Sequence, residues 1–325
     1  MDLSTFVYLK VLKSRGFSRA SWTRVRRLLV RLFDDPECLM LVHNKNLYMP
    51  LSHALPSRLQ SHPFYDRLPK RLGDFMRERY GTLVSVDVGA NIGDSIAAFD
   101  KQDRDIFLAI EPNPKFNAYL RKNWSKDTNV TIIDTICSSR RESKAFDFEE
   151  KFGTASVMSG VGKQRTADTL DNIVLEHKKL LNLNLLKIDT DGYDFEVIQG
   201  ATAIIAKNLP AIFFECGVFS NPTYVESCMA VFAFFKSVGY ESLLLYDNFG
   251  YLMGKYHLDR PCDFLDMIFY EVTSDFHYFD ILVMKQEDIE AFFCSERNSY
   301  MDHLSNKVSQ HAAMMAANFP HGSMD

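Results

Sequence analysis

The chain has 325 residues, of which 46% are hydrophobic and 13% aromatic, enough for one large core plus an appendage at about 100 to 200 residues per domain. It contains no apolar run close to the roughly 20 residues of a membrane-spanning helix, and its first residues lack the basic-then-apolar order of a signal peptide. Its six cysteines show no C-x-x-C spacing, which indicates neither a zinc cage nor a disulfide framework. We therefore expect a globular cytoplasmic protein with reduced thiols.

The net charge of −5 is unevenly distributed along the chain. Residues 1–82 hold 15 Lys and Arg against 7 Asp and Glu, a net +8, which leaves −13 on the remainder. Four arginines of the basic part, Arg24, Arg26, Arg27 and Arg31, cluster in one amphipathic segment. This segment could contact a membrane surface or an anionic glycan, or it could be an ordinary solvated helix. It lacks the interleaved aromatic residues of nucleic-acid-binding grooves, so we expect no nucleic acid partner.

The first 82 residues predict a separate set of elements. Residues 5–33 have the spacing of one or two short helices, and residues 39–51 alternate around an Asn-Lys-Asn turn at 44–46, which is typical of a hairpin. Residues 63–80 predict a helix that ends at Gly81. We expect residues 1–82 to form a cap, or substrate-side extension, in front of the core.

From residue 83 the chain alternates apolar strands with helices, which predicts an α/β fold with a mainly parallel sheet and helices on both faces. We expect this domain to span residues 83–285, with extra short strands at 143–158 and an insertion near the site at 250–275. Residues 286–325 predict a helix followed by a flexible tail. The seven strands are expected at 83–88, 106–110, 130–136, 184–189, 210–216, 240–246 and 279–285.

A glycine-containing turn joins the first of these strands to a helix, in the stretch SVDVGANIGDSIAAF at 85–99. Its pattern is Asp87-x-Gly89-x-Asn91-x-Gly93, and the glycines let backbone N–H groups approach a ligand closely. The dinucleotide fingerprint G-x-G-x-x-G is not met, because asparagine replaces its middle glycine and the spacing differs. The turn therefore favours S-adenosylmethionine over a nicotinamide cofactor. A nicotinamide-dependent oxidoreductase with a similar Rossmann-like core is the alternative.

Five motifs in order resemble the FkbM family of S-adenosylmethionine-dependent methyltransferases. The resemblance covers about residues 83–285 and implies a class I methyltransferase fold, a Rossmann-like seven-stranded sheet whose last strand, Tyr278–Lys285, is antiparallel. It also implies O-methylation of a hydroxyl on a sugar, a glycan or a secondary metabolite; a non-catalytic S-adenosylmethionine-binding protein is a further alternative. The motifs are VDVGANIGD at 86–94, AIEPNP at 109–114, TLDNI at 169–173, LLKIDTDGYDFEVIQGA at 185–201 and FFECG at 213–217.

The cofactor is expected to contact the turn and the end of the second strand. Glu111 lies 24 residues after Asp87 and could accept both ribose hydroxyls, or it could only cap the next helix. Asn113 should cap the helix that Pro114 opens. The resemblance implies that Asp134 lies at the adenine edge and that the GTASV run at 153–157 lies near the cofactor. The expected cofactor-binding residues are Asp87, Gly89, Asn91, Gly93, Glu111, Pro112, Asn113, Asp134 and Ser156.

Three carboxylates, Asp189, Asp191 and Glu215, follow the fourth and fifth strands, which should end side by side where ligands bind. A hydroxyl acceptor needs a general base, and we expect Asp189 in that role with Glu215 as its partner. Alternatively, Asp189 and Glu215 could hold Mg²⁺, although no third oxygen ligand follows Glu215. Helix capping and salt bridging would be the purely structural roles. Lys187 is expected to be an ion-pair partner.

Overall fold

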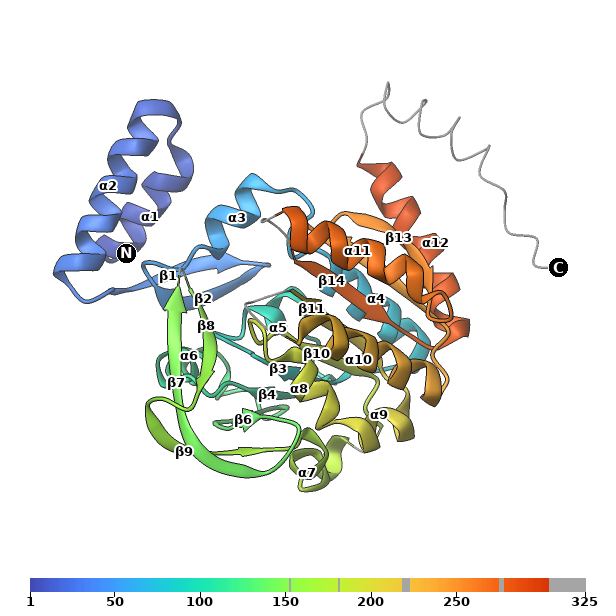
Figure 1. The fold of residues 1–325 in the computed structure, drawn as a ribbon. Coiled ribbons are helices and arrows are strands. Elements are labelled where there is room, and N and C mark those ends of the chain that lie inside the picture. The colour runs from blue at the N-terminus through green and yellow to red at the C-terminus, as the bar shows by residue number, and fades with distance from the viewer. Residues whose placement is uncertain (152, 181, 218–222, 275–277, 304–325) are drawn as a thin grey trace.

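The computed structural model describes residues 1–151, 153–180, 182–217, 223–274 and 278–303 of the chain; most of the expected flexible tail lies outside them. A twisted sheet forms the centre of the molecule, with the strand order β13-β12-β14-β11-β10-β3-β4-β5 (Figure 1). Its strands are β3 (Val84–Val88), β4 (Ile106–Ile110), β5 (Val130–Ile133), β10 (Leu185–Ile188), β11 (Ala211–Cys216), β12 (Ser242–Asp247), β13 (Leu252–His257) and β14 (Phe279–Val283).

The strand order confirms the predicted α/β fold with a class I methyltransferase sheet. Strands β5, β4, β3, β10 and β11 run parallel, and β14 enters antiparallel between β11 and β12. The chain order reverses between β3 and β10, so their carboxyl ends form the topological switch point at which ligands bind such sheets. One detail differs from the prediction. The insertion at 250–275 adds β13 to the sheet edge as an eighth strand and then forms helix α11 (Pro261–Ser274).

Helices cover both faces of the sheet, because alternate strand residues point to opposite sides. Val84, Val86 and Val88 of β3 enter one hydrophobic core, whereas Ser85 and Asp87 face the other side. The first face packs against α7 (Leu170–Leu175), α8 (Asp194–Gln199), α9 (Thr202–Asn208), α10 (Tyr224–Val238) and α11, with a short 3₁₀ helix at Lys178–Leu180. The second packs against α4 (Leu68–Tyr80), α5 (Asp94–Ala98), α6 (Pro114–Trp124) and α12 (Gln286–Asp302).

A second sheet follows β5 and has the order β6-β9-β7-β8. The extra strands expected at 143–158 are present as β7 and β8, which form an antiparallel hairpin. The sequence did not indicate the third long strand, because its residues KQRTAD lack an apolar alternation. The strands are β6 (Ile136–Cys137), β7 (Glu142–Lys151), β8 (Thr154–Ser159) and β9 (Lys163–Asp168).

The extension before β3 consists of a helix pair, a hairpin and a short helix. The predicted hairpin is present, but its turn is His43–Asn44, where both residues have positive φ (45° and 66°), as a two-residue I′ turn requires. The last helix begins at Leu68 and not at 63, and it ends as predicted at Gly81, with φ 80°. The elements are α1 (Leu3–Lys13), α2 (Gly16–Leu32), β1 (Glu37–Val42), β2 (Lys45–Pro50) and α3 (Leu55–Ser61).

The hairpin and the first helix pair relate differently to the core. Met40 and Met49 of the hairpin are buried in the core that α5 and α6 share, and Asn123 of α6 bonds both backbone groups of Tyr48. In the α1–α2 pair, Tyr8 and Val11 of α1 are buried in the same core, whereas α2 has no buried residue and the far end of the pair projects from the body of the protein (Figure 1). Among the described residues, no helix combines the length and the apolar character needed to cross a bilayer.

A buried ion pair fastens the extension to the end of the described chain. Glu296 of α12 has 0% exposure, and its two carboxylate oxygens accept from Arg71 of α4 at 2.5 and 2.8 Å. The hydroxyl of Tyr246 on β12 donates to the same carboxylate at 3.2 Å. Two helices far apart in sequence are thus held together by a bidentate pair, the strongest geometry for such an interaction.

We predict that Arg71→Met lowers the free energy of unfolding by about 3 kcal/mol, because it leaves the carboxylate of Glu296 buried without its cation. The double variant Arg71→Met/Glu296→Met should recover most of this loss, since it removes both charges. Lys70→Met on the same helix is the matched control. Its exposed pair with Asp74 should contribute less than about 1 kcal/mol. Urea unfolding of the four proteins measures the differences, and equal losses for Arg71→Met and Lys70→Met would contradict the prediction.

Candidate active site

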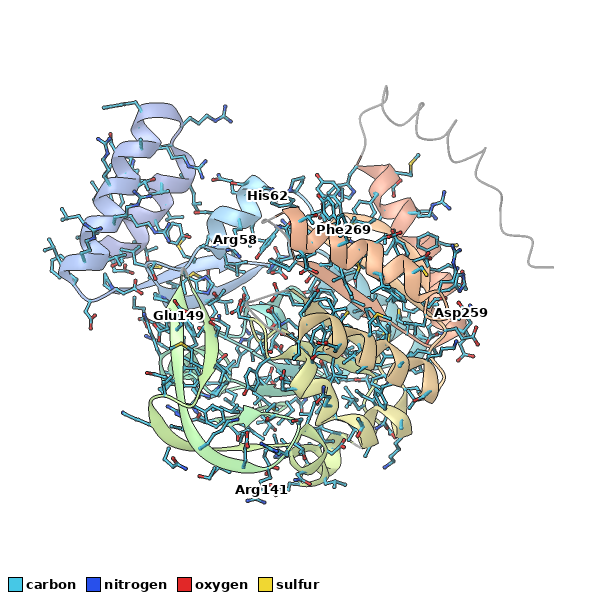
Figure 2. All side chains as sticks on the ribbon, viewed as in Figure 1. Arg58, His62, Arg141, Glu149, Asp259 and Phe269 are labelled. Carbon is cyan, nitrogen blue, oxygen red and sulfur yellow. The ribbon has the colours of Figure 1, made fainter. Side chains whose placement is uncertain are left out.

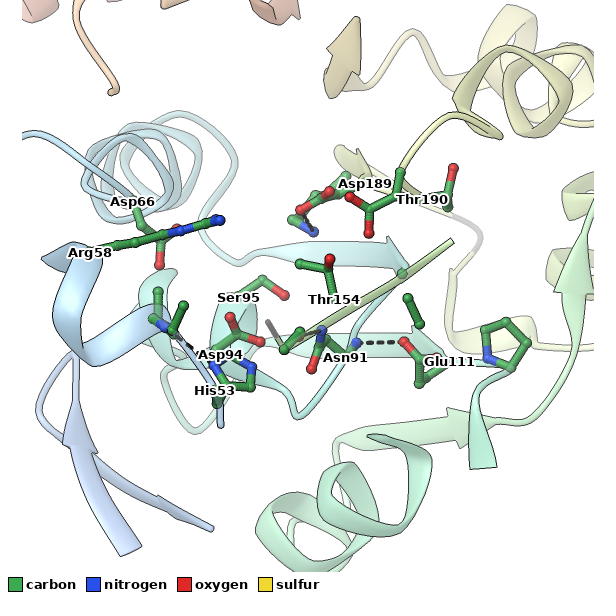
Figure 3. Close-up of a pocket in the computed structure, with 18 of the residues that line it drawn as sticks. His53, Arg58, Asp66, Asn91, Asp94, Ser95, Glu111, Thr154, Asp189 and Thr190 are labelled. Carbon is green, nitrogen blue, oxygen red and sulfur yellow. Dashed lines mark hydrogen bonds and ion pairs between the residues drawn. The ribbon is translucent and has the colours of Figure 1, made fainter. Parts of the chain in front are cut away.

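A cavity opens at the switch point of the sheet, over the carboxyl ends of β3, β4 and β10 (Figure 3). The space between its walls, including the open mouth and the solvent in it, is about 900 Å³. The floor comes from the turn after β3 and from the residues after β4 and β10. One wall comes from α3 and the segment after it, and another from the start of β8. The extension and the core therefore enclose a single site.

The turn after β3 forms part of the floor as the sequence predicts, although its two glycines differ in role. Gly89 lines the cavity with φ 78°, and a Cβ there would lie 1.8 Å from the backbone oxygen of Asp189. A Cβ at Gly93 would instead lie 2.3 Å from the Trp124 ring, whose Nε1 donates to the Gly93 oxygen. Gly89 thus allows β3 and β10 to meet beneath the ligand, whereas Gly93 accommodates a packed tryptophan behind the cavity.

Glu111 lies at the end of β4 with its carboxylate facing the cavity (Figure 3). One of its oxygens accepts from the backbone N–H of Asn91 at 2.8 Å and the other from that of Asn113 at 2.7 Å. Each oxygen retains a lone pair for a further donor. Burial raises the pKa of Glu111 to about 8, against the effect of these two N–H groups. The carboxylate is therefore positioned to accept two hydroxyl donors from a ligand.

The predicted cap of α6 is confirmed. The side-chain oxygen of Asn113 accepts from the backbone N–H groups of Lys115 and Phe116, and Pro114 opens the helix. Because its side chain caps the helix, Asn113 does not line the cavity, whereas its neighbour Pro112 does. Asn113 therefore supports the site by fixing the chain after Glu111.

Lys187 joins the two central strands at the floor of the cavity. Its Nζ lies 3.2 Å from Asp87 and 3.2 Å from Asp189, which confirms its expected role as an ion-pair partner. Burial opposes the charge on Lys187, but these carboxylates outweigh it and raise its pKa. Asp87 is completely buried below the cavity and also accepts from the Ser95 hydroxyl at 2.5 Å. Asp87 thus holds Lys187 and Ser95 in place and does not line the cavity.

The carboxylates after β10 and β11 form an acidic cluster. Asp189 and Asp191 line the cavity, and the side chain of Asp189 is 51% exposed. Burial, followed by the charge of Asp189, raises the pKa of Asp191 to about 6. Burial and the charges of both aspartates raise the pKa of Glu215 well above its ordinary value. Glu215 pairs with Asp280 across β11 and β14 and lies behind the cavity wall.

Half of the predicted site residues do not line the cavity. Asp134 is half exposed and lies 3.9 Å from Arg165, because the chain after β5 turns away into the second sheet. Ser156 on β8 pairs with Glu149 on β7, whereas Ala155 and Val157 beside it line the cavity. The predicted residues that line the cavity are Gly89, Asn91, Glu111, Pro112, Asp189 and Asp191, and those that do not are Asp87, Gly93, Asn113, Asp134, Ser156 and Glu215.

The extension contributes several lining residues, of which the sequence analysis missed Arg58, Tyr65 and Asp66. His53, Arg58, Tyr65 and Asp66 face the core residues across the cavity, and Figure 3 shows Arg58 reaching inward from α3. Arg58 donates to the Tyr65 hydroxyl at 3.0 Å, and burial lowers the pKa of His53 to about 4. Asp94 was also missed. Its position directly after Gly93, the last glycine of the turn, was the sequence feature that could have indicated a lining residue.

The cavity carries a surplus of acidic groups. Five carboxyl groups line it, against the cations of Lys187 and Arg58. Burial, followed by the charge of Asp66, raises the pKa of Asp94 to about 7. This imbalance suits a ligand with positive charge, because a cation near these groups would stabilise their ionised forms. The carboxyl groups are Asp66, Asp94, Glu111, Asp189 and Asp191.

The predicted alternative of a Mg²⁺ site gains no support from the geometry. Lys187 already places a positive charge 3.2 Å from the carboxylate of Asp189, and Glu215 does not reach the cavity. In the described part of the chain, no three His, Cys, Asp or Glu residues are grouped so that they could hold a metal ion. The residues therefore do not fit a divalent cation held by Asp189 and Glu215.

Solved structures with a similar fold include several methyltransferases. Precorrin-6y C5,15-methyltransferase from Geobacter metallireducens is 13% identical over 66% of this chain and 87% of its own, with a TM-score of 0.34. Methyltransferase FkbM from Methylobacillus flagellatus is 12% identical over 71% of this chain and 52% of its own, with a TM-score of 0.36. The plantazolicin methyltransferase BamL, solved with a substrate analogue and SAH, is 9% identical over 87% and 98%, with a TM-score of 0.39.

The comparison with family models identifies one particular kind of methyltransferase domain. No curated protein sequence matches this chain. Residues 87–242 match the model of the methyltransferase FkbM domain. The matched segment begins at Asp87 near the end of β3 and includes Glu111, Lys187 and Asp189 of the site. The family match supports the methyltransferase interpretation over the nicotinamide-dependent alternative. Residues 87–242 of this S-adenosylmethionine-dependent methyltransferase are thus identified as a methyltransferase FkbM domain.

Proposed function

We propose that this methyltransferase acts on a hydroxyl oxygen of a sugar, a glycan or a hydroxylated secondary metabolite. The observation that carries the proposal is the pair of cavity-lining carboxylates after β10, Asp189 and Asp191, because a hydroxyl is a poor nucleophile until a base accepts its proton. An acceptor amine or thiol that is already deprotonated would not need such a group. The arrangement thus favours an acceptor that is protonated at neutral pH.

The floor of the cavity fits the methyl donor. Glu111 offers two lone pairs to the ribose hydroxyls, and Gly89 keeps side-chain atoms away from the ligand at the end of β3. When bound, S-adenosylmethionine supplies an electrophilic methyl group on a positively charged sulfonium. The acidic surplus around Asp189 would stabilise that positive charge. We infer that Asp87 acts through Lys187 and Ser95, by holding the floor in this shape.

Asp191 is better suited than Asp189 to act as the general base, which revises the order expected from the sequence. Its pKa of about 6 lies closer to neutrality than that of an ordinary aspartate, so it combines an ionised state at pH 7 with basicity. Asp189 is engaged with the ammonium group of Lys187. We propose that Asp191 accepts the hydroxyl proton while Asp189 and Lys187 fix its position.

The wall contributed by the extension supports a polar acceptor. Arg58, Tyr65 and Asp66 present a guanidinium, a phenol and a carboxylate to the cavity, and His53 adds an imidazole that is neutral at pH 7. These groups can donate and accept hydrogen bonds to several hydroxyls at once. Neighbouring hydroxyls of a sugar would find partners.

The proposed acceptor class can be tested with S-adenosylmethionine labelled in its methyl group, offered with panels of sugars and hydroxylated metabolites. We expect label in a methyl ether, which survives mild alkali. Label that is released as methanol would indicate a carboxyl acceptor, and label in a methylamine would indicate an amine. Either result would contradict the proposed acceptor. Absence of transfer to every panel, with the cofactor bound, would favour the non-catalytic alternative.

We predict that the affinity for S-adenosylmethionine rises as the pH increases toward the Glu111 pKa of about 8, because the ribose hydroxyls bind the ionised carboxylate better than the protonated one. Glu111→Gln should weaken binding by about 1.5 to 3 kcal/mol and should remove this part of the pH dependence. Isothermal calorimetry measures both quantities, with circular dichroism as the control for folding. A wild-type affinity that is independent of pH would refute the assignment.

The base is tested by the pH profile of kcat/KM for the acceptor at saturating cofactor. We expect activity to rise through a pKa at or below about 6, because Asp191 must be ionised and a nearby sulfonium lowers its pKa. The variant Asp191→Asn should lose this acidic limb of the pH profile and reduce the rate of methyl transfer by on the order of 10² to 10⁴. Asp189→Asn should retain the limb. The opposite pattern would return the role of base to Asp189.

A further inference from the structure

The second helix of the chain, α2, carries an apolar surface that no element among the described residues covers. None of its residues is buried, whereas five residues of the neighbouring helix α1 are. Phe17, Leu28 and Leu32 are 83%, 54% and 66% exposed. Their separations of 11 and 4 residues place them on one side of the helix, and Val25 lies beside them. Four large apolar side chains thus form one exposed stripe along α2.

Arginines flank this stripe. The helix sequence GFSRASWTRVRRLLVRL contains five arginines and no acidic residue. Arg24, Arg27 and Arg31 are exposed and follow one edge of the stripe, and none of them has an acidic partner within the described residues. We call Phe17, Val25, Leu28 and Leu32 together with these three arginines the outer face of α2. It combines apolar surface with uncompensated positive charge.

Arg26 is different from the other arginines. It is half buried and stacks over the Tyr8 ring, 3.9 Å from its centre. Its guanidinium donates to the backbone oxygens of Leu51 at 2.7 Å and His53 at 2.9 Å. The sequence had grouped Arg26 with the exposed arginines, but it instead fixes the inner side of α2 to the segment that lines the cavity. Its position leaves the outer face pointing away from the protein.

The position of the α1–α2 pair makes this face accessible. The pair projects from the body beside α3 (Figure 1), and Figure 2 shows its side chains as sticks around the two helices, with Arg58 of α3 and His62 directly after α3 labelled beside them. A flat partner can therefore approach α2 without contacting the central sheet. The same approach would leave the mouth of the cavity, bounded by α3, on the adjoining side.

We propose that the outer face of α2 docks the protein on an anionic lipid bilayer. The apolar stripe would enter the boundary between headgroups and acyl chains, and the arginines along its edge would contact lipid phosphates. A nucleic acid would match the charge but would leave the apolar stripe without a partner. Pairing of two copies through this face would bring six arginines together without an acid on either helix. An anionic bilayer matches both the positive charge and the apolar stripe of the outer face.

The proposal is tested by co-sedimentation of the full chain with vesicles of phosphatidylcholine alone and of phosphatidylcholine mixed with phosphatidylserine. We expect binding to the mixed vesicles only, weakened by salt because the attraction is screened. The triple variant Arg24→Gln/Arg27→Gln/Arg31→Gln should reduce partitioning by on the order of 10²-fold. Leu28→Ser/Leu32→Ser should reduce it by on the order of tenfold.

Matched controls remove the same groups elsewhere on the surface. Arg104→Gln/Arg141→Gln/Arg260→Gln removes three exposed arginines, and Leu175→Ser/Leu265→Ser removes two exposed leucines. These controls should bind vesicles as the wild type does. Calorimetric affinity for S-adenosylmethionine verifies that every variant is folded.

Three results would overturn the proposal. They are the absence of wild-type binding to phosphatidylserine vesicles, equal losses in the control and α2 variants, and a dimer, seen by light scattering, that dissociates in Leu28→Ser/Leu32→Ser. The last result would assign the outer face to a second copy of the chain. Because vesicle binding requires no acceptor, its outcome is independent of the proposed hydroxyl methylation.

Discussion

The site depends on the two ion pairs that the ammonium group of Lys187 forms. This group lies between the carboxylates of Asp87 on β3 and Asp189 after β10, and so bridges the two strands at which the chain order of the sheet reverses. A buried cation of this kind is tolerated only with both partners in place. Because Gly89 lets the two loops touch directly above it, the floor of the cavity has a single well-defined shape.

The same cation separates the acidic groups by role. Asp87 and Asp189 neutralise Lys187. Burial and the charge of Asp189 raise the pKa of Asp191 to about 6, and burial with the charges of both aspartates raises the pKa of Glu215. Environment therefore gives neighbouring carboxyl groups different roles in one site.

The sequence predicted the fold well and the site only in part, for separable reasons. Apolar runs and turn residues are local signals, so the strands of the main sheet and the end of α4 at Gly81 were found. Residues that follow strands directly, such as Glu111 and Asp189, were also placed correctly in the cavity. Asp134 was misplaced because the direction of the chain after β5 depends on a second sheet. Arg58 was missed because no local pattern indicates which distant core an extension covers.

The way in which the core is shared has a consequence for biosynthesis. A single hydrophobic cluster contains Val11 of α1, Met40 of β1, Leu120 of α6 and Phe292 of α12. Segments made first on the ribosome thus find most of their packing partners within the first half of the chain, and α12 closes the cluster only after it has been synthesised. The last helix therefore completes a core that the first residues begin, so folding of this cluster couples the two ends of the described chain.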